Sequence, residues 1–413
     1  MTSLKDIWDR WTSTSLILRI LGGILIGTVL ALIVPGMLGI VVLGDIFVGA
    51  LKAVAPILVL LIIISSIANS GSGLGSRFGF IITLYLGTTV IAAIIAVVMA
   101  YAFPVTVTFT GDPGTYEATT DVAEYLAQLL RNMVSNPVTA IMEGNYISIL
   151  FWAALVGYSM KVLVSDTTKK MVSDLAMVAN KIVSLFIQFA PIGILGIIYN
   201  TVSSNGLDIF VEYGQLILLL VATMCIVIFI SNPIIAGTIM KGNPYPLLFR
   251  CLKDSGITAF FTRSSAACIP VNLKLCEDLG IDKEFYSVSI PLGATINMDG
   301  AAITVSIMSL VAAFSLGMDV PISMAMVLCI IATIAACGSS GITGGSLLLI
   351  PMCCSLLGIS GDIAAQMIGI GFIIGVIQDS VETMLNVSSD ALFTAVAEVS
   401  DRKKKGIDKP LNL

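Results

Sequence analysis

The sequence predicts an all-α polytopic membrane protein with eight transmembrane helices and two oppositely oriented re-entrant helical hairpins, arranged as inverted repeats. Composition is the first reason, because 57% of the 413 residues are hydrophobic and 11% are charged, whereas about 25% are charged in soluble domains. The second reason is that charge-free intervals fill most of the chain, and a membrane-spanning helix needs about 20 such residues. The third is that two apolar intervals of the second half are interrupted by polar or glycine-rich tips.

The chain contains no histidine, which excludes whole classes of enzyme site. A Ser/His/Asp triad, a histidine-ligated haem, a HExxH zinc site and a histidine proton relay all require that residue. The 8 cysteines form no CxxC motif and suit small apolar packing positions. The only basic cluster is Arg402–Lys405 and the net charge is -5. We therefore expect no enzyme, no organic cofactor and no nucleic-acid partner.

Six transmembrane helices are expected before residue 245. They correspond to the charge-free intervals 20–44, 53–76, 78–111, 144–160, 182–207 and 213–240. The first interval is too long for a cleaved signal peptide, and the residues that flank it carry charges of both signs. Trp8 and Trp11 suit a membrane interface, so we interpret residues 1–19 as a retained amphipathic lead-in.

The basic residues of the loops predict how these helices are oriented, because cytoplasmic loops are enriched in lysine and arginine. On the opposite side, only Lys52 and Arg131 are basic. The alternation predicts cytoplasmic N- and C-termini and a multi-pass membrane protein. It is carried by Lys5, Arg10, Arg19, Arg77, Lys161, Lys169, Lys170, Lys181, Lys241, Arg250, Lys253 and Arg402–Lys405.

Two segments of the second half are better explained as hairpins than as full crossings. Residues 255–273 have basic residues on both flanks and a polar tip at Thr262–Ser265; residues 320–361 carry a glycine- and serine-rich tip at 337–346. Exposed backbone of this kind cannot face lipid and must line a cavity in the protein. Each hairpin precedes a helix with an Asn/Asp pair, which is the pattern of inverted repeats with broken helices in many secondary transporters.

Five ionisable residues lie inside these apolar segments, and intramembrane charges indicate function. If all are ionised they carry +1 and -4, so bound cations or protonated carboxyl groups must balance them. Nearby oxygens from Asn297, Asn386, Thr295 and Ser339 favour a hard cation. The alternative is that the carboxylates only pair with the arginine or hydrogen-bond to the backbone. The five are Arg263, Asp299, Asp379, Glu382 and Asp390.

Helical spacing gathers polar side chains on two of the predicted helices. On the final helix a polar stripe faces a cavity, whereas on the third helix the hydroxyls alternatively bond back to their own helix. The final-helix stripe is Asp379, Glu382, Thr383, Asn386 and Asp390, and the third-helix group is Tyr85, Thr88 and Thr89.

Three segments, 258–268, 293–300 and 379–390, resemble the glutamate-transporter family, the dicarboxylate/amino acid:cation symporters. The similarity covers essentially the whole chain and is greatest to the bacterial sodium-coupled serine/threonine branch. It implies a homotrimer in which a transport domain moves against a trimerising scaffold by an elevator-like step. Residues 1–243 would form mainly the scaffold, with helices 3 and 6 partly in the transport domain, residues 244–400 the transport core, and residues 401–413 a cytoplasmic tail.

The resemblance also implies roles for individual residues. The substrate carboxylate would bind Ser265 and Asn386, and its ammonium group would bind Asp379 with main-chain oxygens of Arg263 and Ile342. The remaining substrate-site residues would be Ser264, Glu382 and Thr383. The first sodium ion would be bound by Asp390 and the carbonyls of Gly293, Asn297 and Asn386. The second would be bound by Met298 and the carbonyls of Thr295, Ala336, Cys337 and Ser339. The third would be bound by Asp299, Asn297, Tyr85, Thr88 and Thr89.

The departures from the family pattern bear on the substrate. Members that carry acidic amino acids have an arginine where this chain has Glu382, and a glutamate would repel a second carboxylate. Ala266-Ala267, Thr343 and Gly375 also depart from the family pattern. We expect sodium-coupled uptake of serine or threonine; a proton-coupled amino-acid or dicarboxylate carrier of the same fold is the main alternative, and a channel is another. Glu382 is alternatively protonated, or turned toward Arg263.

Overall fold

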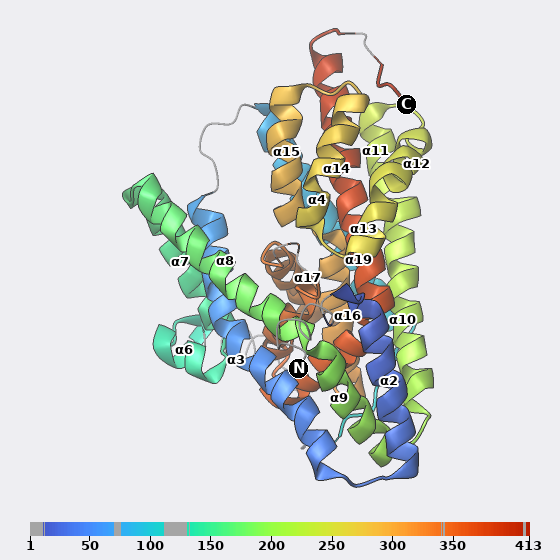
Figure 1. Cartoon of the computed structure of the whole chain (residues 1–413). Coiled ribbons are helices and arrows are strands. Elements are labelled where there is room, and N and C mark those ends of the chain that lie inside the picture. The colour runs from blue at the N-terminus through green and yellow to red at the C-terminus, as the bar shows by residue number, and fades with distance from the viewer. Residues whose placement is uncertain are drawn as a thin grey trace, which may run out of the picture.

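A computed structural model describes residues 11, 13–69, 76–110, 130–131, 133–339, 341, 343–407 and 410–413. This part of the chain consists of helices and their connections, with no strand among the described residues. Most of the predicted lead-in, including Trp8, and the tip residue Ile342 lie outside it. Figure 1 shows an upright bundle that contains α4, α10, α16 and α19, with α6, α7 and α8 lying to its left.

The helices of the first half follow the predicted order, but some boundaries differ, and residues Asp166–Gln188 form a helix although the sequence predicts that Lys169, Lys170 and Lys181 lie in a loop. They are α2 (Leu16–Ile33), α3 (Leu38–Ala68), α4 (Ser76–Ala102), the short α6 (Pro137–Glu143), α7 (Tyr146–Leu163), α8 (Asp166–Gln188), α9 (Ala190–Asn205) and α10 (Ile209–Ile226), which continues through a π-helical turn, Val227–Ser231, into α11 (Asn232–Met240). The charge-free interval 20–44 contains the α2–α3 turn, and 182–207 contains the α8–α9 boundary. Absence of charge therefore did not mark these helix ends.

The α2–α3 turn is fixed by a residue far away in the sequence. The hydroxyl of Tyr199 on α9 donates to the carbonyl oxygen of Val34 at 2.5 Å and accepts from the N–H of Met37 at 2.7 Å. Gly36 in the turn has φ +89°, a conformation that glycine adopts without a steric penalty. Helix α2 packs along α9, and α3 packs against α7, α8 and α9.

The structure has both helical hairpins that the sequence predicts. The first arm of hairpin 1 is α12 (Tyr245–Cys251), a π-helical turn (Leu252–Gly256) and α13 (Ile257–Thr262), and the second arm is α14 (Ser265–Asp278). Hairpin 2 consists of α17 (Ile322–Ala336), then a 3-10 turn (Ser346–Leu349) and α18 (Ile350–Leu356). Arg263 turns the chain at the tip of hairpin 1 with φ +53°, and Ser264 caps α14 by accepting the N–H of Ala267.

The helices that follow the two hairpins differ from each other. Asn297 and Met298 interrupt the first, which is divided into α15 (Lys283–Ile296) and α16 (Asp299–Ser315). The second, α19, is continuous from Gly361 to Lys404 and so includes the first residues of the predicted tail. Residues 299–313 of α16 are all buried, and α16 packs against α4, α17 and α19. The break in α15–α16 therefore lies inside the protein.

Seven helical stretches in the described part of the chain are long and apolar enough to cross a membrane. They are Leu38–Ser65, Arg77–Ala102, Tyr146–Leu163, Asp166–Gln188, Ile209–Met240, Lys283–Ser315 and Gly361–Lys404. Three shorter apolar helices are Leu18–Ile33, Ile322–Ala336 and Ser346–Leu356, the last two of which belong to hairpin 2. The chain is a multi-pass helical membrane protein.

Candidate functional site

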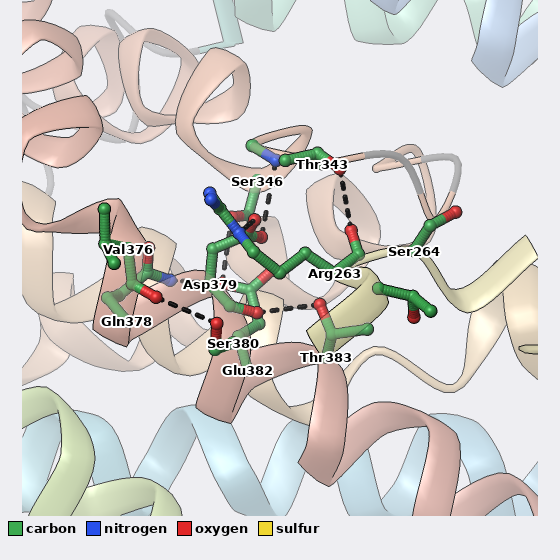
Figure 2. A network of polar contacts seen from close by, with 12 residues as sticks. Arg263, Ser264, Thr343, Ser346, Val376, Gln378, Asp379, Ser380, Glu382 and Thr383 are labelled. Carbon is green, nitrogen blue, oxygen red and sulfur yellow. Dashed lines mark hydrogen bonds and ion pairs between the residues drawn. The ribbon is translucent and has the colours of Figure 1, made fainter. Parts of the chain in front are cut away.

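The tips of the two hairpins meet beside α19. The hydroxyl of Ser264 donates to the carbonyl oxygen of Gly341 at 3.1 Å, and the hydroxyl of Thr343 donates to the carbonyl oxygen of Arg263 at 2.9 Å. Gly341 has φ +59°, and a Cβ there would lie 3.0 Å from both the Ala294 carbonyl oxygen and the Ser265 Cβ. The two tips thus close tightly over the polar face of α19, as Figure 2 shows.

Asp379 of α19 contacts both tips. Its Oδ2 is 2.8 Å from Nε of Arg263, and its Oδ1 accepts the N–H of Gly344 at 3.3 Å. Asp379 is 2% exposed and Arg263 5% exposed, so this ion pair is shielded from water. Thr383, one turn along α19, donates its hydroxyl to the carbonyl oxygen of Asp379 at 2.7 Å. Asp379 is therefore a buried anionic group at the junction of the two hairpins.

Glu382 lies in a separate polar cluster (Figure 2). Its Oε2 accepts hydrogen bonds from Thr304 of α16 at 2.6 Å, from Ser346 of hairpin 2 at 2.9 Å and from Gln378 of α19 at 2.5 Å. The ion pair of Arg263 in the described structure is with Asp379 and not with Glu382. The alternative that Glu382 turns toward Arg263 is therefore not what the structure shows.

Asn297 lies at the break between α15 and α16. It belongs to the first predicted cation group, which is the set of residues expected to bind the first sodium ion. Its amide nitrogen lies 2.9 Å from Oδ1 of Asp390 and 3.5 Å from the carbonyl oxygen of Asn386. The side-chain oxygen of Asn386 accepts the N–H of Gly300, the second residue of α16, at 2.7 Å. A Cβ on Gly293 would lie 2.7 Å from Oδ1 of Asp390, so only glycine lets the α15 backbone approach this carboxylate so closely.

The residues of the third predicted cation group also lie together. Thr88 donates to the side-chain oxygen of Asn297 at 3.4 Å, and Thr89 donates to Oδ1 of Asp299 at 3.1 Å. Both hydroxyls are also within hydrogen-bond distance of the Tyr85 carbonyl oxygen, at 3.1 and 2.8 Å. Each of the two hydroxyl groups therefore lies near both its own helix backbone and a residue of the predicted cation group.

The second predicted cation group lies where the α15–α16 break faces the end of α17. Met298 is 1% exposed and accepts the amide of Asn386 on its sulfur at 3.5 Å. The thiol of Cys337 is 3.6 Å from the carbonyl oxygen of Ile296. Ala336 and Ser339 are buried, whereas the side chain of Thr295 is exposed and bonds to its own helix. The contact between Cys337 and Ile296 brings the end of α17 to the α15–α16 break, and binding of a cation by Met298 and the four carbonyls stays a prediction.

The buried charges are not balanced within the described part of the chain. Asp299, Asp379, Glu382 and Asp390 are each at most 5% exposed, and the only described ion pair to any of them is that of Asp379 with Arg263. The donors to the other three are hydroxyl and amide groups. Unbalanced carboxylates of this kind require a bound cation or a proton, and the carbonyl, amide and hydroxyl oxygens around them suit a hard cation.

The sequence is similar to known proteins over nearly its whole length. The model of the sodium:dicarboxylate symporter family matches residues 16–400. The chain belongs to this family. It is 50% identical to the serine/threonine transporter SstT of Streptococcus thermophilus over 97% of the chain and 100% of that protein. It is 51% identical to SstT of Streptococcus agalactiae, over 97% and 100%, and 48% identical to SstT of Bifidobacterium adolescentis, over 99% and 95%.

Family membership confirms the resemblance inferred from the sequence and makes the chain a membrane transporter, not an enzyme. The structure adds residues that the sequence patterns did not identify. Thr304, Ser346 and Gln378 surround Glu382, and Asn232 contacts Asp299 through a 3.1 Å bond from its amide nitrogen to Oδ2. An asparagine beside a proline in an apolar helix was the available signal for Asn232, but its partner lies 67 residues further along the chain.

Proposed function

We propose that this protein is a sodium-coupled symporter that carries serine, threonine and similar small neutral amino acids into the cell. The observation that supports this most directly is the set of four buried carboxylates with one buried arginine. Cations that enter with the substrate would neutralise the excess charge, so the loaded site would be far less costly to keep away from water than the empty one. The family name and the names of the relatives fit this proposal.

The substrate would lie between the hairpin tips and α19. Ser265 begins α14, a 14-residue helix, with its side chain buried, and helix N-termini favour anions such as an amino-acid carboxylate. Asn386 would hold the same carboxylate. The ammonium group would bind Asp379 and main-chain oxygens at the tips, and would compete there with Arg263 and with the hydroxyl of Thr343.

The sodium ions would bind around the break between α15 and α16. One would be held by Asp390 and the carbonyls near it, a second near Met298 and the tip of hairpin 2, and a third by Asp299 with the hydroxyls of α4. Carboxylate, hydroxyl, amide and backbone oxygens form the donor set that hard cations prefer. The site residues meet at interrupted helices and hairpin tips, as in transporters whose binding sites lie near the midplane of the membrane.

An elevator-type movement would expose this site alternately to the two sides of the membrane. The packing supports a division between a scaffold of α2, α3, α7, α8 and α9 and a core of the hairpins, α15, α16 and α19, with α4 and α10 packed against that core. We also propose a homotrimer in the cell inner membrane with cytoplasmic termini. Large apolar side chains are exposed on α8, among them Met171, Met177 and Val178, and they would contact lipid or a second copy.

The decisive experiment is uptake of radiolabelled serine into proteoliposomes with sodium and pH gradients imposed separately. We expect saturable uptake driven by a sodium gradient at equal pH on both sides. Uptake driven by the pH gradient in sodium-free buffer would favour the proton-coupled carrier instead, since carboxyl groups can also take up protons. A flux that does not saturate with serine would indicate a channel.

A further inference from the structure

Asn232 lies against the carboxylate of the third cation group but belongs to a helix outside the hairpins. It is the first residue of α11, its side chain is 1% exposed, and its amide nitrogen is 3.1 Å from Oδ2 of Asp299. Its side-chain oxygen, Oδ1, is buried and has no hydrogen-bond partner among the described residues. A buried acceptor without a partner is destabilising unless something else uses it.

The helix is distorted where Asn232 lies. The N–H of Asn232 donates to the carbonyl of Val227, five residues earlier, in a π-helical turn. Pro233 has no N–H to donate, and the carbonyl oxygen of Phe229, four residues before it, instead accepts the hydroxyl of Tyr245 at 3.1 Å. Such π-helical turns are rare and frequently occur at functional sites. The hydroxyl of Tyr245 in hairpin 1 thus replaces the backbone donor that the Phe229 carbonyl lacks. At the same turn, the side-chain amide of Asn232 contacts Asp299.

The surroundings of Asp299 lack a positive partner. The carboxylate is fully buried, it accepts from Thr89 and Asn232, and it takes part in no ion pair of the described residues. A carboxylate held only by neutral donors in a dry site requires a cation or a proton. Because an asparagine amide carries one donor group and one acceptor oxygen, Asn232 can orient the carboxylate and also offer an oxygen to an ion.

We propose that Asn232 is an additional residue of the sodium site at Asp299. Its amide nitrogen positions the Asp299 carboxylate, and its free side-chain oxygen is a ligand for the sodium ion. This inference rests on the proposed function, because it takes sodium to be the transported cation. It gives α11 a direct part in ion binding, although the helix lies before the hairpins in the chain. It also makes the selectivity among alkali cations depend on α11, since the number and spacing of oxygen ligands set that selectivity.

The test is equilibrium binding of radioactive sodium to the purified full chain in detergent without amino acid. Asn232→Leu keeps a similar volume and removes both polar groups, so we expect sodium affinity to fall by about tenfold or more and the sodium-to-lithium affinity ratio to change. Thr223→Val is the control, because Thr223 is also fully buried on the same long helix but donates only to its own helix, to Leu219 at 2.7 Å. This control should bind sodium like the parent protein.

Three outcomes separate the possibilities. A folded Asn232→Leu protein with the affinity and the ion ratio of the parent overturns the role of Asn232. If that variant elutes as an aggregate in size-exclusion chromatography, Asn232→Ser replaces it and the same criterion applies. A parent protein that binds no sodium overturns the proposed function itself, and the inference falls with it.

Discussion

At the scale of single residues, the pair of Asp379 and Arg263 lies where we propose that the amino acid binds. The two charges are 2.8 Å apart and buried, so each is costly without the other. A substrate ammonium group at Asp379 would replace or join the guanidinium group as the positive partner. Asp379 is then either part of the substrate site or only a counter-charge for Arg263. Single and double substitutions distinguish these two roles.

We predict that Asp379→Ala lowers serine uptake by at least about a hundredfold, because the substrate ammonium group would then have no anionic partner in a dry site, and an unpaired buried charge costs about 3–5 kcal/mol. The measurement is uptake at saturating sodium, normalised to the amount of folded protein. The double variant Arg263→Ala, Asp379→Ala should stay inactive. Recovery of uptake in the double variant would show that Asp379 only neutralises Arg263.

Glu382 is predicted to exclude acidic substrates by its charge. Three donors hold its Oε2 within 2.9 Å; these hydrogen bonds favour the ionised form, whereas burial opposes it, and the prediction takes Glu382 as ionised. In a dry pocket, two carboxylates repel each other by several kcal/mol, enough for discrimination of about a thousandfold. Aspartate should therefore compete poorly with labelled serine in the parent protein.

In Glu382→Gln the same competition should strengthen by at least about tenfold relative to serine, because the substitution removes the charge and keeps the shape. Thr304→Val is the matched control: it removes a 2.6 Å donor to Glu382 but leaves the charge, so aspartate should still be excluded. Strong competition by aspartate in the parent protein would refute the repulsion argument.

At the scale of elements, the closure of the two hairpins depends on a glycine. Gly341 has φ +59° and no room for a side chain beside Ala294 and Ser265. A left-handed conformation costs about 1–2 kcal/mol for a residue with a Cβ, and here crowding adds to that cost. The backbone conformation of hairpin 2 at Gly341 thus allows the two tips to make close contact.

We predict that Gly341→Ala weakens the apparent affinity for serine by about tenfold, because the tips no longer close over the substrate. Gly358→Ala is the control, since Gly358 has φ +74° but a Cβ added there would meet no other atom within 4 Å. It carries the same backbone cost without the crowding. Equal serine affinities in the two variants would mean that tip contact does not contribute to binding.

At the scale of the whole molecule, the proposed transport core is held together at one end by ion pairs. Arg77 at the start of α4 pairs with Asp282, the residue before α15, at 2.9 Å and also with Glu398 of α19. Arg402 adds a 2.7 Å pair to Glu398 and a 2.5 Å bond to the carbonyl oxygen of Gly280 after hairpin 1. These contacts join α4, α15, α19 and hairpin 1, so we expect them to move as one body.

The elevator proposal predicts that fixing this body to the scaffold stops transport. A Cβ on Gly369 of α19 would lie 3.2 Å from the Cδ1 atom of Ile197 on α9. In a background without native cysteines, the pair Ile197→Cys and Gly369→Cys should be bridged by mercuric ion and lose most of its uptake, with recovery after addition of a thiol. Each single variant is a control. Full uptake in the bridged protein would contradict the movement.

The sequence by itself determined the class of fold, both hairpins and the main polar groups. Composition and charge-free intervals depend only on local chemistry, because every apolar run must be buried or face lipid. The tip at Thr262–Ser265, the pair of Asn297 and Asp299 and the stripe from Asp379 to Asp390 are also local patterns. Family resemblance then assigned the sodium and substrate residues, and these assignments stay predictions; the structure shows direct contacts for some of them, such as Asn297 with Asp390 and Thr89 with Asp299.

Only the tertiary structure decided which groups meet. The α2–α3 turn is bonded on both sides by Tyr199 of α9, a partner that the turn's own sequence does not specify. Glu382 accepts bonds from three different elements, and Asn232 reaches Asp299 from α11. A buried polar group must find a partner, but its local sequence does not specify which one. Helix packing makes that choice, and it brings residues distant in the chain to the same ion site.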